Sequence, residues 1–259
     1  MHTAPMNGGG TALFDRMAST GTKLLAAYFP VADPLVPLEL LDVYGDERVD
    51  LIELGIRAPD PHLEGDTIRR SMLRSTGSGR VADAGEALQR MAGFSSGSQS
   101  VIFAYPHPEL VAGTEDWDGA DILLCAGPYT STRDHIVSGA RAADVSIAEF
   151  VPYRIEDADL ERASTASSYV MLQYAPGKTG IRDGFDRSAR ARLQQLRQHG
   201  IAAPILLGVG ISTSDQCRHA LDCGADGIVV GSKTVMMAEK GRAALTDYLG
   251  EIRRVMDGR

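Results

Sequence analysis

A glutamate at position 53 stands inside an otherwise apolar run, residues 49–55. A carboxylate in such a run is costly to bury unless it is paired or used, and burial raises its pKa toward the range that suits acid–base catalysis. Two interpretations of Glu53 are open. An ion pair with Arg57 or another arginine would make it structural, whereas its place near the carboxyl end of the run favours catalysis. We predict that Glu53 is a general acid–base.

The segment that follows, residues 57–66, contains three further carboxylates and a histidine. Asp60 lies between two prolines, which is typical of a turn. Glu64 precedes a helical pattern, where an acid also complements the positive end of the helix dipole. Only closeness to Glu53 makes this segment a candidate for chemistry.

Glycine-rich turns late in the chain predict a site for phosphate. Residues 208–212 read Gly-Val-Gly-Ile-Ser, and residues 231–233 read Gly-Ser-Lys, each between an apolar run and a helical pattern. Glycines at such turns let backbone N–H groups approach an anion. One loop alone could merely turn the chain, but two together favour phosphate binding. A third segment, residues 175–182, has two glycines around Lys178 and Thr179 and predicts a loop that closes over substrate.

Other chemistries have less support from the sequence. The six histidines do not cluster at the spacing of metal ligands, and the three cysteines are too scattered for a disulfide framework or a zinc site. None of the four lysines stands where a Schiff-base lysine of a barrel is expected. The chain shows no serine nucleophile elbow and no dinucleotide fingerprint. We therefore expect neither a metal nor a cofactor.

The elements that must position these residues are short apolar runs alternating with amphipathic segments. The runs are apolar on both faces, as strands of a parallel sheet are. They span Lys23–Phe29, Val49–Leu54, Ser100–Tyr105, Ala120–Cys125, Ser146–Val151, Tyr169–Tyr174, Pro204–Leu207 and Gly227–Val230. Eight strands, each followed by a helix, predict an α/β fold of the (β/α)₈ TIM-barrel type rather than an open doubly wound sheet.

Helix boundaries and domain organisation follow from the same pattern. We expect one helix from Pro34 to Tyr44, two within residues 65–91 that are separated at 77–79, and one over 238–256. Residues 1–17 would form an extra N-terminal helix, and residues 1–259 a single barrel domain. Barrels place their chemistry at the carboxyl ends of the strands, which is where Glu53 and the glycine turns stand.

Composition restricts the surroundings of the protein. The net charge of −8 argues against a nucleic-acid partner, although a phosphorylated small molecule can still be held by backbone N–H groups. No run approaches the length of a membrane span, so no membrane association is expected. The first ten residues lack the basic start and apolar run of a signal peptide, which predicts a cytoplasmic protein.

Taken in order, these motifs resemble the tryptophan synthase α-subunit family over nearly the whole chain. Residues 28–34 are similar to the opening strand and turn of that family, and residues 52–55 to its catalytic-glutamate strand. Residues 177–180 look like its closing loop. Residues 208–212 and 225–232 resemble its two phosphate-loop motifs. Each motif alone is modest, but their order and spacing together are specific.

The resemblance implies a lyase that cleaves indole-3-glycerol phosphate to indole and glyceraldehyde 3-phosphate by a retro-aldol step, without metal or cofactor. Glu53 would shuttle the proton, and Glu64 would accept or orient the proton on the indole nitrogen. The residues implied to contact the substrate and its phosphate are Tyr28, Thr179, Gly180, Gly210, Gly231 and Ser232.

The departures from the family lie on the indole side. The second acid of the family is an aspartate, whereas this chain has Glu64, and the aligned tyrosine of the sixth strand is Met171. The ends of the third and fourth strands, residues 104–108 and 126–128, also differ. A TIM-barrel lyase or isomerase for another phosphorylated compound therefore stays open, as does a non-catalytic phosphometabolite-binding partner of a β-like subunit. The loop after the second strand contacts the β subunit in this family, and its altered sequence weakens that partnership here.

Overall fold

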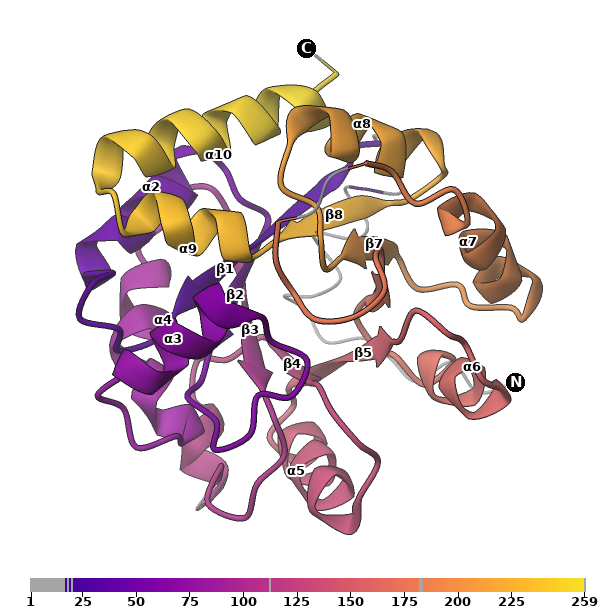
Figure 1. Cartoon of the computed structure of the whole chain (residues 1–259). Coiled ribbons are helices and arrows are strands. Elements are labelled where there is room, and N and C mark those ends of the chain that lie inside the picture. The colour runs from indigo at the N-terminus through magenta and orange to yellow at the C-terminus, as the bar shows by residue number, and fades with distance from the viewer. Residues whose placement is uncertain (1–16, 18, 20, 112, 182–183, 259) are drawn as a thin grey trace.

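Eight parallel strands close into a barrel, with helices around its outside (Figure 1). The computed structural model describes residues 17, 19, 21–111, 113–181 and 184–258. The strands are β1 (Leu24–Pro30), β2 (Leu51–Gly55), β3 (Gln99–Ala104), β4 (Ile122–Cys125), β5 (Ser146–Val151), β6 (Val170–Gln173), β7 (Ile205–Gly208) and β8 (Gly227–Val230). Each strand pairs with the next, and β8 pairs with β1, so the predicted (β/α)₈ barrel is confirmed.

Helices follow the strands and cover the outer face of the barrel. The α-helices are α2 (Leu41–Asp46), α3 (Asp66–Arg74), α4 (Gly85–Met91), α5 (Ser131–Ala142), α6 (Asp157–Ala163), α7 (Ala189–Gln198), α8 (Ser214–Asp222), α9 (Ser232–Ala238) and α10 (Arg242–Met256). Short 3₁₀ turns are η1 (Leu38–Leu40), η2 (Val81–Ala84) and η3 (Thr114–Trp117). The predicted break at residues 77–79 is confirmed, because α3 ends before it and η2 begins after it.

Two helix boundaries differ from the prediction. Pro34 does not start a helix, because the Asp33 carboxylate caps a turn by accepting the N–H of Leu35, and Pro37 keeps extended backbone angles. The helix expected over residues 238–256 is present as α10 with the expected end, but it begins later, at Arg242. A separate helix, α9, ends at Ala238, and Gly241, where φ is +101°, lies between the two. The N-terminal helix expected over residues 1–17 lies, apart from Met17, outside the described residues.

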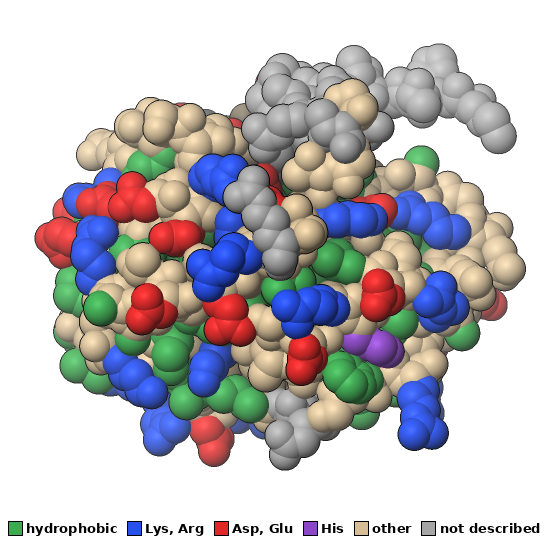
Figure 2. Space-filling view, turned by 90° about the horizontal axis from the view of Figure 1, so that it is seen from above, with side chains coloured by type: hydrophobic (Ala, Val, Ile, Leu, Met, Phe, Trp, Pro, Cys, Tyr) green, Lys and Arg blue, Asp and Glu red, His purple; other side chains and the backbone are tan. Residues whose placement is uncertain are grey.

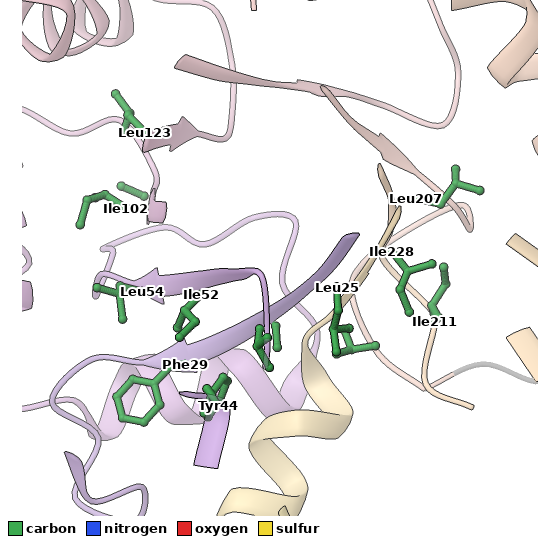
Figure 3. Packing of buried hydrophobic residues seen from close by; sticks show 14 of the residues in the cluster. Leu25, Phe29, Tyr44, Ile52, Leu54, Ile102, Leu123, Leu207, Ile211 and Ile228 are labelled. Atoms are coloured by element: carbon green, nitrogen blue, oxygen red, sulfur yellow. The ribbon is translucent and has the colours of Figure 1, made fainter. Parts of the chain in front are cut away.

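The strands bury both of their faces, which explains why their sequences are apolar throughout. Outward-facing residues of the strands pack against the helices in one large layer. Figure 3 shows part of this layer, with Phe29 of β1 beside Tyr44 of α2. Phe29 and Tyr44 meet edge to face, and the Tyr44 hydroxyl donates a hydrogen bond to the Tyr28 carbonyl, so α2 is held firmly against β1.

The inward-facing residues form a second cluster inside the barrel. Alternation along β1 places Leu24, Ala26 and Tyr28 in it, and the pairing of β1 with β2 sets Tyr28 beside Glu53. Glu53 therefore points into the barrel from a level near the carboxyl ends of the strands. From the sequence alone, the Glu53 side chain could face either the barrel interior or the surrounding helices. The register shows that it faces the interior.

The outer surface carries mixed charge. On the face shown in Figure 2, lysines and arginines are interspersed with aspartates and glutamates, and neither sign gathers into one continuous field. No helix within the described ranges is long and apolar enough to cross a membrane. Over the same ranges, the histidine, cysteine and acidic side chains do not gather in threes that could hold a metal ion.

Candidate active site

A pocket opens at the carboxyl ends of the strands and brings the two predicted ends of the site together. Glu53 and Glu64 line it on the side of β2, and Gly180, Gly210 and Ser232 line it on the side of β6 to β8. The remaining predicted site residues, Tyr28, Thr179 and Gly231, line the same pocket. Segments more than a hundred residues apart in the chain thus meet in one cavity, as the barrel topology requires.

Glu53 is buried inside the barrel, with a side chain that reaches this pocket. Tyr169 directly precedes β6, and its hydroxyl donates a hydrogen bond of 3.2 Å to Oε1 of Glu53. Burial raises the pKa of Glu53 to about 8; the Tyr169 hydrogen bond opposes the shift and the nearby Glu64 adds to it. A carboxyl group with this pKa is protonated at neutral pH and can still give up its proton.

An ion pair does not account for Glu53. No lysine or arginine within the described ranges forms a salt bridge with it, and Arg57 instead donates to the carbonyl of Gly77 on the exposed side of the loop. The structural interpretation that the sequence left open, a pair with Arg57 or another barrel arginine, is therefore wrong. The carboxyl group is kept in an apolar barrel by one tyrosine hydroxyl.

Glu64 is also buried, although it stands on the loop before α3 rather than on a strand. Its Oε1 atom accepts a hydrogen bond of 2.7 Å from the Tyr105 hydroxyl, and its Oε2 atom accepts one of 2.6 Å from the Thr179 hydroxyl. Burial raises the pKa of Glu64, while these two hydrogen bonds pull it back down. The first turn of α3 holds Asp66 instead, so Glu64 is not the acid that complements the helix dipole.

Thr179 joins the loop after β6 to the loop after β2. Besides its bond to Glu64, it accepts the N–H of Gly65 on its Oγ1 atom at 2.8 Å, and its own N–H donates to the Leu63 carbonyl at 2.9 Å. A Cβ atom at Gly65 would lie 2.0 Å from the Thr179 carbonyl oxygen, so the close approach requires glycine. The segment predicted as a closing loop thus lies over the pocket.

The turns that we predicted to bind phosphate have unusual backbone geometry. Val209 and Gly210 both have positive φ, +68° and +98°, directly after β7. A β-branched residue there is strained, and such strain is concentrated at functional sites. Ser232, at the start of α9, is buried, and its hydroxyl has no hydrogen-bond partner within the described ranges. An unpartnered buried donor beside glycine turns suits an anionic ligand.

Aromatic side chains also line the pocket. Phe103 meets Tyr28 edge to face at 5.8 Å and Tyr105 at 5.7 Å, measured between ring centroids. Phe150 and Met171 complete this wall. The hydroxyl of Tyr28 is buried without a partner in the described part of the chain, and burial, then Glu64 and Glu53, raise its pKa well above the usual value. It therefore remains a hydrogen-bond donor.

Comparison with known proteins agrees with this arrangement. A family model described as tryptophan synthase alpha chain matches residues 14–254. The chain belongs to the tryptophan synthase alpha chain family. Proteins with that name from Synechococcus elongatus and Archaeoglobus fulgidus are 29% and 30% identical to it. The first match covers 94% of this chain and 95% of the relative, and the second covers 85% and 90%.

Solved structures agree on the fold. A structure of Mycobacterium tuberculosis tryptophan synthase gives a TM-score of 0.83 at 21% identity, covering 97% of this chain and 99% of the other. Tryptophan synthase subunit alpha from Legionella pneumophila gives 0.78 at 16% identity, covering 98% and 100%. Membership in the tryptophan synthase alpha chain family thus accompanies the same barrel over nearly the whole length.

Some residues of the site were not singled out from the sequence. Tyr105 and Tyr169 hold the two carboxylates, and Phe103 builds the apolar wall. Alternation along the strands could have identified two of them, because Phe103 and Tyr105 lie two residues apart and share one face of β3 and its extension. Val209 carried no such signal, since its positive φ follows from the geometry of the turn.

Proposed function

We propose that this chain is a lyase that cleaves indole-3-glycerol phosphate to indole and glyceraldehyde 3-phosphate. The observation that carries the proposal is the pair of buried carboxyl groups, Glu53 and Glu64, in one pocket with the glycine turns at residues 210 and 231. A substrate with a heteroaromatic ring at one end and a phosphate at the other fits the division of this pocket into an aromatic wall and a donor-rich turn region.

Glu53 performs the proton transfers in this proposal. Its pKa of about 8 leaves it protonated at neutral pH, so it donates a proton to carbon 3 of the indole ring. The resulting carboxylate then takes the proton from the hydroxyl on the adjacent side-chain carbon. As that oxygen becomes the aldehyde, the carbon–carbon bond breaks and its electron pair returns to the ring. The proton count is unchanged over the cycle, and Glu53 is regenerated.

Glu64 accepts a hydrogen bond from the indole N–H in this proposal. Protonation at carbon 3 makes the ring N–H acidic, and a carboxylate nearby stabilises the positive charge that develops there. Tyr105 and Thr179 hold one oxygen each, so the carboxylate has a fixed position with lone pairs still free to accept from the ring nitrogen. In this proposal Glu64, which is one methylene longer than the family aspartate, takes its role from the loop before α3.

The phosphate of the substrate binds to the turns after β6, β7 and β8. Gly180, Gly210 and Gly231 allow backbone N–H groups to approach it, and the unpartnered Ser232 hydroxyl supplies a further donor. Thr179 positions the loop over the ligand. Tyr28 contributes its free hydroxyl to a polar atom of the substrate near the carboxyl groups.

Indole release from indole-3-glycerol phosphate by the purified chain tests the proposal, with Glu53→Gln as the catalytic variant. Glutamine keeps the size of the side chain but cannot exchange a proton, so indole production should fall by roughly a hundredfold or more. Glu86→Gln is the matched control, because Glu86 is exposed on α4 far from the pocket lining, and it should leave the rate unchanged. Equal rates for the two variants would refute the role of Glu53.

A second candidate is a lyase or isomerase for another phosphorylated compound. It is favoured by the wall residues Phe103, Phe150 and Met171, because the last stands where the family has a tyrosine. This candidate predicts that phosphorylated ligands protect the protein against thermal unfolding although indole is not released. A non-catalytic binding partner of a β-like subunit predicts the same protection with no effect of Glu53→Gln on any reaction.

We propose that the chain acts on a phosphorylated substrate in the cytoplasm and that a tryptophan synthase β-like chain is an optional partner. The bonds of Thr179 to Leu63, Glu64 and Gly65 form within this chain alone, which supports activity without a partner. Indole release that rises less than about tenfold on adding a β chain would agree with this. Activity that appears only with the β chain would contradict it.

A further inference from the structure

A lysine lies in the wall of the pocket next to the phosphate turns. Lys233 is half-buried at the second position of α9, directly after Ser232. Among the described lining residues it is the only one with a positively charged side chain, whereas Glu53 and Glu64 line the same pocket with acids. The other lysine of this region, Lys240, is exposed beyond the end of α9 and does not line the pocket.

Lys233 has no acidic partner among the residues that the structure describes. Within the described residues, no aspartate or glutamate forms a salt bridge with Lys233. By contrast, the nearby Arg74 pairs with both Asp33 and Glu239. A cation in the first turn of a helix is also disfavoured by the helix dipole, so its placement costs free energy in the absence of an anion.

The neighbours of Lys233 are donors as well. Ser232 is only 6% exposed, and its buried hydroxyl has no hydrogen-bond partner in the described part of the chain. The left-handed turn at Gly210 and the loop residue Gly180 line the pocket beside it. Lys233 and Ser232, which are adjacent in the chain, therefore bring a positive charge and a donor without a partner to the same pocket.

We infer that the Lys233 ammonium group binds the phosphate of the substrate directly and makes the site selective for a dianionic phosphate monoester. The inference rests on the phosphorylated substrate of the proposed function, but not on the cleavage of a carbon–carbon bond. Backbone N–H groups carry only partial charge, and a chain charge of −8 opposes the binding of an anion. A full positive charge at the phosphate end offsets that repulsion.

Binding of sn-glycerol 3-phosphate, measured by titration calorimetry on the full chain, tests this assignment. A charge-assisted hydrogen bond is worth about 1.5–3 kcal/mol, so Lys233→Ala should weaken binding by roughly 10- to 150-fold. Lys233→Arg keeps the charge and should retain most of the affinity. Lys240→Ala removes a charge from the same region without touching the pocket and should bind as the wild type does.

Two further readouts separate direct contact from a structural role. Salt screens an ion pair, so raising ionic strength from about 0.05 to 0.5 M should weaken wild-type binding more than binding by Lys233→Ala. The second ionisation of a phosphate monoester lies near pH 6, so the advantage of the wild type should grow between about pH 5 and 7. A merely structural lysine would change neither dependence.

The experiments test the phosphate contact of Lys233 and the proposed lyase reaction independently of each other. Equal affinity and equal salt dependence of wild type and Lys233→Ala would overturn the inference, as would a wild type that does not bind glycerol 3-phosphate. Binding that depends on Lys233 in a chain that releases no indole would refute the proposed reaction and leave the phosphate contact standing. Lys233→Ala without ligand could have a lower melting temperature than the wild type. Lys233→Arg, which keeps the positive charge, then still tests the inference, because binding by this variant that does not depend on salt would overturn it.

Discussion

The Thr179 hydroxyl donates a 2.6 Å hydrogen bond to Oε2 of Glu64, and these residues stand 115 positions apart in the chain. The same Thr179 oxygen accepts the N–H of Gly65, so its donor and acceptor capacities are both used. The position of the loop after β6 and the position of the second carboxylate are thereby coupled. Closing the pocket and orienting Glu64, the acid that we propose to face the indole nitrogen, are therefore coupled.

Removing this hydroxyl should uncouple the two loops. Thr179→Val keeps the shape of the side chain but deletes the bonds to Glu64 and Gly65, each worth about 1 kcal/mol. We expect a loss of roughly tenfold or more in kcat/KM and faster proteolytic cleavage of the loop in the presence of a phosphorylated ligand. Thr165→Val is the control, since its hydroxyl donates to the carbonyl of Arg162 on the surface and Thr165 does not line the pocket. Unchanged kinetics for Thr179→Val would show that the loop closes without this contact.

The raised pKa of Glu53 makes stability depend on pH. The folded protein holds its proton up to about pH 8, whereas the unfolded chain releases it near pH 4.5. Between these values the folded state binds more protons, so the free energy of unfolding falls as pH rises, by up to about 1.4 kcal/mol per pH unit from this group. Above pH 8 the contribution is constant.

Urea unfolding of the wild type and of Glu53→Gln from pH 5 to 9 measures this effect. Glutamine does not titrate, so the variant should become more stable relative to the wild type as pH rises, with the difference levelling off above about pH 8. Asp66→Asn, an exposed acid at the start of α3, should show no such growing difference. A stability difference that is flat over this range would mean that Glu53 is ionised in the folded protein.

Much of the fold could be predicted from the sequence, because strands buried on both faces are apolar at every position. The eight runs fall on β1 to β8 within a few residues at each end. The two late glycine turns could also be predicted, because glycines that directly follow an apolar run indicate a tight turn at the end of a strand. Glu53 was conspicuous because a charged residue interrupts one of these apolar runs.

Details set by contacts distant in the chain could not be predicted. Asp33 caps a turn because Arg74 and Ser71 of α3 hold its carboxylate, so a plausible helix start at Pro34 is not used. Burial of Glu64 depends on Thr179 and Tyr105, which come from two other loops. No local pattern distinguishes Glu64 from a solvated first-turn acid, and only the closed barrel brings its partners together.

The opposite end of the barrel should govern stability rather than catalysis. Arg253 of α10 forms a buried ion pair of 2.9 Å with Asp50, whose carboxylate also accepts the N–H of Leu25. Removing one partner of a buried pair costs about 3–5 kcal/mol, so Arg253→Met should lower the free energy of unfolding by that amount. Arg218→Met breaks the exposed pair with Asp215 on α8 and should cost under about 1 kcal/mol.

Kinetics separate this stabilising role from catalysis. Below its melting transition, Arg253→Met should keep the KM and kcat of the wild type, because Arg253 does not line the pocket. Residues at the amino ends of barrel strands act on stability, whereas those at the carboxyl ends act on chemistry. A specific loss of kcat in the folded variant would contradict that division.

Tyr28 should show the reverse relation between stability and function. Its hydroxyl is buried in the pocket wall with no partner among the described residues, and an unpaired buried hydroxyl costs about 1–3 kcal/mol. Tyr28→Phe removes that cost, so the free protein should be as stable as the wild type or more so. If the hydroxyl binds a polar atom of the substrate, the same variant should lose roughly tenfold in kcat/KM.

Tyr248 provides the matched comparison for this experiment. Its hydroxyl is likewise buried and unpartnered in the described structure, but it lies on α10, away from the pocket. Tyr248→Phe should therefore stabilise the protein to a similar extent with no change in kinetics. Thermal unfolding and steady-state indole release, measured on both variants, distinguish the two sites. If Tyr28→Phe is more stable than the wild type and loses no activity, the Tyr28 hydroxyl contacts no substrate atom in the reaction.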